Sequence, residues 1–91
     1  MDPLLKEIDT VVRENFPGAV TELQLVDGRA WGFVLWKKFQ DIREGERVSR
    51  LHDVLRQHFG RNHRKKLSTI LPFTPWEMKI MREEQARPQN Y

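Results

Sequence analysis

The densest group of chemically capable side chains is a basic segment between residues 60 and 66. Four cations and one histidine follow Gly60 there, in the order Arg61, Asn62, His63, Arg64, Lys65 and Lys66. Clustered cations bind phosphate groups, and counterion release then drives nucleic-acid binding. Cations that follow a helix also offset its macrodipole and keep a loop soluble. The segment therefore has both a phosphate-binding and a purely structural interpretation.

Aromatic and basic residues also alternate in Trp36-Lys37-Lys38-Phe39. This combination occurs where bases stack above a charged groove. It is equally typical of a strand end whose aromatic side chain enters the core while the lysines stay in water. No GxxG loop, the backbone feature of KH-type RNA readers, occurs in the chain. One hypothesis is an RNA- or DNA-binding domain whose contacts are Lys37, Arg61, Arg64, Lys65 and Lys66.

Metal ligation and catalysis find little support in the residue pattern. His52, His58 and His63 lack the spacing of three or four that puts two imidazoles on one helical face, and the chain has no cysteine. The only serines, Ser49 and Ser68, lie in no GxSxG elbow, and no Walker or Rossmann glycine pattern occurs. We therefore predict a protein that is not an enzyme, with no catalytic residues, no metal and no cofactor of its own.

Composition limits the class of protein. The chain has 91 residues, with 16 lysines and arginines against 13 acidic residues, a mild basic excess. No apolar run is long enough to span a bilayer, and the first residues lack the order of a signal peptide. These features predict one cytoplasmic domain over residues 1–87, without a membrane partner, followed by a flexible tail over 88–91.

Local signals predict the elements that must position these residues. Asp2 and Pro3 begin an amphipathic helix that ends before Pro17-Gly18. Two alternating segments, 21–26 and 31–39, form a hairpin around Asp27-Gly28. A second helix runs from 45 to 59 and ends at Gly60, a third strand covers 67–73, and residues 74–77 have the capping-box sequence Thr-Pro-Trp-Glu that starts a final helix. The sequence predicts an α+β fold in the order αββαβα, with a three-stranded mixed sheet and helices packed on one face.

Alternation along the strands predicts two unlike sheet faces. The odd-numbered face is strongly apolar, and we expect the helices to cover it. The even-numbered face carries four apolar residues that this arrangement leaves open, so it is predicted to bind a protein partner or a second copy. Alternatively, the last helix or the tail buries this patch within the monomer. The odd-numbered set is Leu23, Leu25, Trp31, Phe33, Leu35, Leu67, Leu71 and Phe73, and the even-numbered patch is Val26, Val34, Trp36 and Ile70.

Three segments resemble the BolA-like family, whose fold is similar to a type II KH domain. They are residues 32–39, the helix opening at 50–55 that contains His52, and the strand 67–73 that is followed by Thr74-Pro75. Together they cover about half of the chain. The resemblance implies the same element order, no catalytic activity, and an adaptor or regulator role.

The resemblance also implies a monothiol glutaredoxin as partner and a shared [2Fe-2S] cluster. The family's histidine ligand near the start of strand three is replaced here by Lys66, and lysine is a poor metal ligand near neutral pH. His63 lies three residues earlier. The preferred interpretation is therefore a protein-binding module without a cluster of its own. Its predicted partner-binding residues are Val34, Trp36, Ile70, His52, His63 and Lys66.

Overall fold

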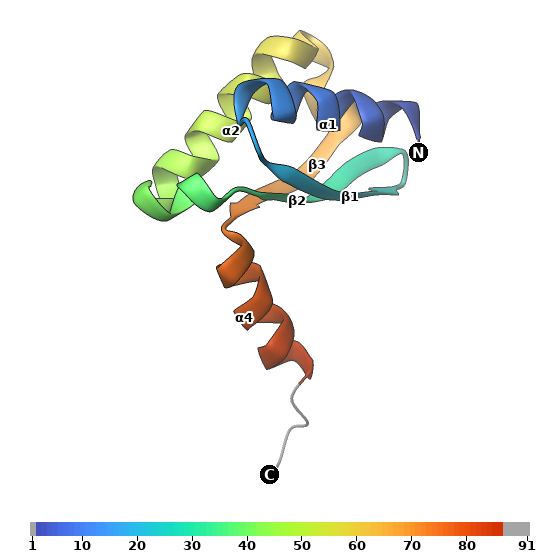
Figure 1. Ribbon diagram of the computed structural model, residues 1–91. Helices are drawn as coiled ribbons and strands as arrows, with labels where there is room; N and C mark the ends of the chain where they lie inside the picture. Colours follow the sequence, from blue (N-terminus) through green and yellow to red (C-terminus); the bar gives the residue numbers. More distant parts are fainter. Residues whose placement is uncertain (1, 87–91) are drawn as a thin grey trace.

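The computed structural model describes residues 2–86 of the chain. Their order confirms the predicted αββαβα fold with a three-stranded mixed sheet (Figure 1). The tail expected over 88–91 lies outside the described residues. The elements are α1 (Pro3–Asn15), β1 (Val20–Val26), β2 (Arg29–Leu35), η1 (Lys37–Asp41), α2 (Glu44–Phe59), η2 (Gly60–Asn62), α3 (His63–Lys66), β3 (Leu67–Phe73) and α4 (Pro75–Ala86).

The strands lie in the order β1-β2-β3, with β1 antiparallel and β3 parallel to the central β2. A two-residue turn joins β1 to β2, and both of its residues have positive φ, 53° at Asp27 and 76° at Gly28. Such a turn matches the right-handed twist of the flanking strands. The predicted hairpin is therefore confirmed, although β2 ends at Leu35 and Phe39 belongs to η1.

Helix boundaries follow the predicted caps. The Asp2 carboxylate accepts a hydrogen bond of 2.8 Å from the Leu4 N–H at the start of α1. Gly60 ends α2 with φ at 58°, a conformation that suits glycine. At the start of α4, Thr74 and Glu77 exchange hydrogen bonds of 2.7 and 3.1 Å, which confirms the capping box.

The core lies between the sheet and the pair α1 and α2, which cover one face (Figure 1). Helix α1 contributes Ile8 and Val12, and α2 contributes Leu51 and Leu55, all buried. The sheet meets them with Val34 and Ile70. Among residues 2–86, no helix has the length and apolar character needed to cross a membrane.

The prediction of which sheet face is covered was wrong for β2 and for Ile70 of β3, whereas Leu23 of β1 and Leu67 of β3 pack against the core as predicted. Val34 is 0% exposed and Ile70 is 2% exposed, so the even-numbered side of β2 faces the helices. The neighbouring positions on this side of β2 are Ala30 and Gly32, whose small size makes the covered side look less hydrophobic than the side of Trp31, Phe33 and Leu35. In β3 the register shifts between Ala30↔Leu67 and Gly32↔Ile70. This irregularity puts both Leu67 and Ile70 on the covered side, against simple alternation.

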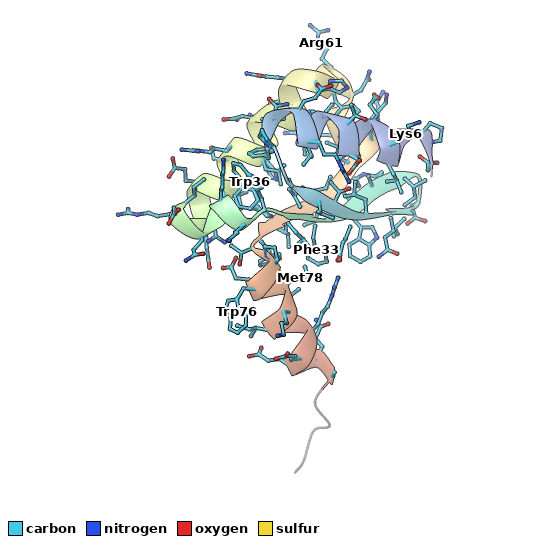
Figure 2. All side chains as sticks on the ribbon, in the orientation of Figure 1. Lys6, Phe33, Trp36, Arg61, Trp76 and Met78 are labelled. Carbon is cyan, nitrogen blue, oxygen red and sulfur yellow. The ribbon has the colours of Figure 1, made fainter. Side chains whose placement is uncertain are left out.

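Helix α4 lies on the other side of the sheet from α1 and α2 (Figure 1). Met78 of α4 is 2% exposed and lies on the same side of the sheet as Phe33 (Figure 2). Further along α4, Arg82 forms an ion pair with Glu22 of β1. Helices α1 and α2 therefore pack on one face as predicted, whereas α4 partly covers the other.

Candidate functional site

A pocket of about 240 Å³ opens between α2, α3 and the first residues of β2 and β3. Most of its polar lining is cationic or titratable, and its floor is apolar. No carboxylate lines it. The lining residues are Arg29, His52, Leu55, Arg56, His63, Arg64, Leu67, Ser68 and Ile70. This set is called the basic pocket below.

The parallel pairing of β2 and β3 brings distant parts of the chain to this pocket. Ala30 pairs with Leu67, so the start of β2 lies beside the start of β3. The Arg29 guanidinium donates a 2.9 Å hydrogen bond from Nη2 to the Leu67 carbonyl, which holds this side chain at the pocket. His52 and Arg56 are four residues apart on α2 and therefore share one helical face.

The charges around the pocket are largely uncompensated. Asp53 lies 3.7 Å from Arg56, but both side chains are mostly exposed, 62% and 60%, so water screens the pair. His63 donates from Nδ1 to the Gly60 carbonyl at 2.9 Å, which leaves its Nε2 free for another partner. Within residues 2–86, Arg64 forms no ion pair. The pocket is therefore suited to an anionic group.

The structure brings together some of the residues predicted for binding and separates others. His52, His63 and Arg64 line the basic pocket. Lys66 is exposed and its Nζ lies 5.6 Å from the centre of the Phe59 ring. Arg61 and Lys65 are also exposed, and Arg61 projects from the end of the molecule opposite Trp76 (Figure 2).

Lys37 does not join this group. It follows the end of β2, whereas the basic pocket lies at the start of β2 and β3. Seven strand residues at about 3.3 Å each correspond to a separation of roughly 23 Å. Lys37 and the basic pocket therefore do not form one compact site, and a joint role with Arg61 and Arg64 stays a prediction that needs a ligand long enough to reach both.

Two pocket residues, Arg29 and Arg56, were missed by the sequence interpretation. Arg56 is four residues after His52 on a predicted helix, so helical spacing alone predicts that they share a face. Arg29 was harder to predict, because its place at the pocket follows only from the parallel register of β2 and β3. The predicted mixed sheet, in which a helix connects the second strand to the third, contained that signal.

The predicted apolar patch is not one continuous surface, because only Val26 of its four residues is largely exposed, and this corrects the assignment of Val34 and Ile70 as partner-binding residues. Val34 and Ile70 are buried beneath the helices. Trp36 donates from Nε1 to the Pro17 carbonyl at 2.8 Å, and its ring centre lies 5.2 Å from those of both Phe16 and Phe39. These contacts hold Trp36 against the core of the same chain, so its role is in packing.

A second hollow of about 610 Å³ lies between η1 and the first turn of α4. Trp76, 64% exposed, forms part of its lining together with Lys37 and Gln40. The other charges in this hollow, Arg47 and Glu77, are paired with each other at 2.7 Å. It therefore presents less free charge than the basic pocket.

Among the residues of the basic pocket, His52 and His63 are the two with side chains that commonly bind metals. In the part of the chain that the structure describes, no three histidine, cysteine, aspartate or glutamate side chains converge. The position that the BolA-like resemblance assigns to a histidine ligand holds Lys66, whose ammonium lies over Phe59.

No family model, no curated protein and no solved structure matches this chain.

Proposed function

We propose that this domain binds RNA or DNA, with a backbone phosphate held in the basic pocket. The observation that carries the proposal is the convergence of three arginines and two histidines on one pocket that no carboxylate lines. Arginine presents a planar fork of donors that matches two phosphate oxygens at once. The pocket volume of about 240 Å³ accommodates a group of this size.

The exposed cations next to the pocket extend the footprint along a strand. Arg61 and Lys65 lie in η2 and α3, which also supply His63 and Arg64 to the pocket. Phosphate contacts fix position but carry no base information. We therefore expect binding that depends strongly on salt and weakly on sequence.

Fluorescence anisotropy with labelled single-stranded oligomers over a salt series tests the proposal. Each neutralised phosphate contributes about −0.7 to the slope of log K against log salt for a single strand. The double substitution Arg56→Gln and Arg64→Gln removes two cations, so we expect a slope shallower by about 1.4 and weaker binding. Both side chains are exposed, so the fold should persist.

Lys79→Gln is the matched control, because Lys79 is an exposed cation on α4 and lies outside the basic pocket. It should leave the slope within about half a unit of the unmodified protein, as one weak contact at most is lost. Equal losses in the control and the pocket variant, or no binding at low salt, would contradict the proposal.

A protein partner of the glutaredoxin type is the second candidate. Its support is the element order shared with the BolA-like family, together with two histidines, His52 and His63, at one end of the domain. Such binding should change little with salt. Titration with a monothiol glutaredoxin tests it, and Lys66→His should add cluster absorption in the visible range if the family role holds. An unchanged spectrum with no complex would count against this candidate.

A further inference from the structure

Strand β1 is an edge strand that exposes much of the apolar surface of this domain. No described strand pairs with its outer side. Five large hydrophobic residues are exposed among residues 2–86, and three of them belong to β1: Val20 at 50%, Leu25 at 38% and Val26 at 48%. An exposed edge with apolar side chains is a template for pairing with another strand.

The two edges of the sheet differ in how they are protected. Strand β3, the other edge, contains Pro72, which has no N–H to donate, and its register shifts between Leu67 and Ile70. Both features discourage an added strand. Strand β1 has no proline, glycine or lysine and pairs regularly with β2 over its whole length. The sheet is therefore open to pairing at β1 alone.

The backbone groups on the free side of β1 belong to alternate residues. Val26 and Arg29 flank the two-residue turn and pair with each other, so the even-numbered residues of β1 direct their N–H and C=O groups toward β2. The odd-numbered residues Thr21, Leu23 and Leu25 therefore direct theirs outward. Six backbone groups are available for a new strand.

We propose that β1 pairs antiparallel with β1 of a second copy of this chain, with a two-fold axis at Leu23. In this register Leu23 faces Leu23 of the second copy, and Thr21 faces Leu25. All six outward groups are then used, because both residues of each pair direct their backbones outward. The result is a continuous six-stranded sheet, and the proposal is independent of nucleic-acid binding.

The side chains are self-complementary in this register. Val20 faces Val26 of the second copy in a non-hydrogen-bonded pair, where side chains approach most closely. Both valines are about half exposed in the single chain, so pairing covers them. Glu22 faces Gln24, whereas an axis at Glu22 would place two glutamates opposite each other. The register centred on Leu23 also overlaps all seven residues of β1.

Charge substitutions at the paired valines test the proposal by sedimentation equilibrium. The unmodified chain should associate above its monomer mass of 10.9 kDa as concentration rises. In the double variant Val20→Lys and Val26→Lys, lysines of the two copies would face each other, so this variant should remain monomeric. The double variant Val20→Glu and Val26→Glu should remain monomeric for the same reason. An equal mixture of the two variants should recover dimers at least tenfold more tightly than either alone, because opposite charges then face each other.

Trp76→Lys is the control, since it changes an even more exposed apolar residue outside β1 and should leave association unchanged. A monomer at millimolar concentration for the unmodified chain would overturn the proposal. So would loss of association in the control, or a mixture of the two charge variants that stays monomeric while each variant keeps its circular dichroism spectrum.

A cysteine at the axis gives a second, geometric test, because the chain has no cysteine of its own. Leu23→Cys places two thiols across a pair whose Cα atoms are about 5.5 Å apart, within disulfide range. Leu25→Cys is the matched control. In this register the two introduced cysteines are four residues apart along the paired strands, so their Cα atoms are roughly 13 Å apart. Oxidation should cross-link the first variant and leave the second monomeric. Equal cross-linking of both would place the axis elsewhere and overturn the register.

Discussion

Arg47 and Glu77 form an ion pair, with Nη1 and Oε1 2.7 Å apart, that joins the start of α2 to the first turn of α4. The same Oε1 accepts a 2.7 Å hydrogen bond from the Thr74 N–H, and Arg47 also donates from Nε to the Ile42 carbonyl. Arg47 is only 6% exposed. One carboxylate therefore closes the capping box of α4 and neutralises a buried guanidinium.

Replacing Arg47 should destabilise the domain. Arg47→Met keeps most of the side-chain volume but leaves the Ile42 carbonyl and Glu77 without this donor. We expect the free energy of unfolding to fall by about 1–3 kcal/mol, measured by urea denaturation. The control is Arg50→Met, which removes an exposed pair with Glu46 on the same helix. That change should cost no more than about 0.5 kcal/mol. Equal losses in both variants would contradict a special role for Arg47.

The charge of Glu77 should make part of this stability depend on pH. Burial raises the pKa of Glu77, but hydrogen bonds from Thr74 and Arg47 outweigh burial and lower it below its ordinary value. Because the pKa of Glu77 is lower in the folded state, the charged carboxylate stabilises the domain at pH values above the ordinary glutamate pKa. This stabilisation is lost as the pH falls through the pKa of the folded state.

Glu77→Gln tests this dependence, because glutamine still completes a capping box but carries no charge. Its loss of stability relative to the unmodified protein should be greatest near neutral pH. The loss should narrow below the ordinary glutamate pKa of about 4.3. Urea denaturation of both proteins across this range gives the difference, and a loss that is independent of pH would show that charge is not the cause.

The elements of this fold were predictable because their signals are local. The Asp2 cap, the Asp27-Gly28 turn and the capping box at Thr74 each depend on residues within one turn of chain. Periodicity also gave the alternation of β2. It did not give the side that the helices cover, because alternation is the same for either choice of face. Ala30 and Gly32 are small, and their side was wrongly assigned to solvent.

The basic pocket was predictable only in part for a related reason. His63 and Arg64 drew attention as members of a basic segment. Arg29 joins them through the parallel pairing of β2 with β3, a contact between residues far apart in sequence. Arg47 is another such case: it precedes Leu51 by four residues on the buried stripe of α2, and its partner is on α4. Tertiary contacts of this kind leave little trace in composition.

Trp36 is expected to act on stability, because its indole packs between Phe16 and Phe39 and donates to Pro17. Trp36→Ala should lower the free energy of unfolding by about 2–4 kcal/mol, somewhat less than a fully buried aromatic residue. Trp76→Ala, at a residue 64% exposed, is the matched control and should change stability by less than about 0.5 kcal/mol. Thermal unfolding followed by circular dichroism measures both. Unchanged stability in Trp36→Ala would show that its ring does not support the core.

Gly32 allows β1 and β2 to pair closely, and no other residue should replace it. Its φ is 147°, and a Cβ atom there would lie 2.0 Å from the Glu22 carbonyl oxygen. Gly32→Ala must therefore push β1 away from the central strand, and we expect a loss of more than about 3 kcal/mol. Gly45→Ala is the matched control: nothing lies within 4 Å of its added Cβ, and its helical position favours alanine. That variant should gain up to about 1 kcal/mol. Urea denaturation ranks the two, and a Gly32→Ala variant as stable as Gly45→Ala would mean that the strands can separate at little cost.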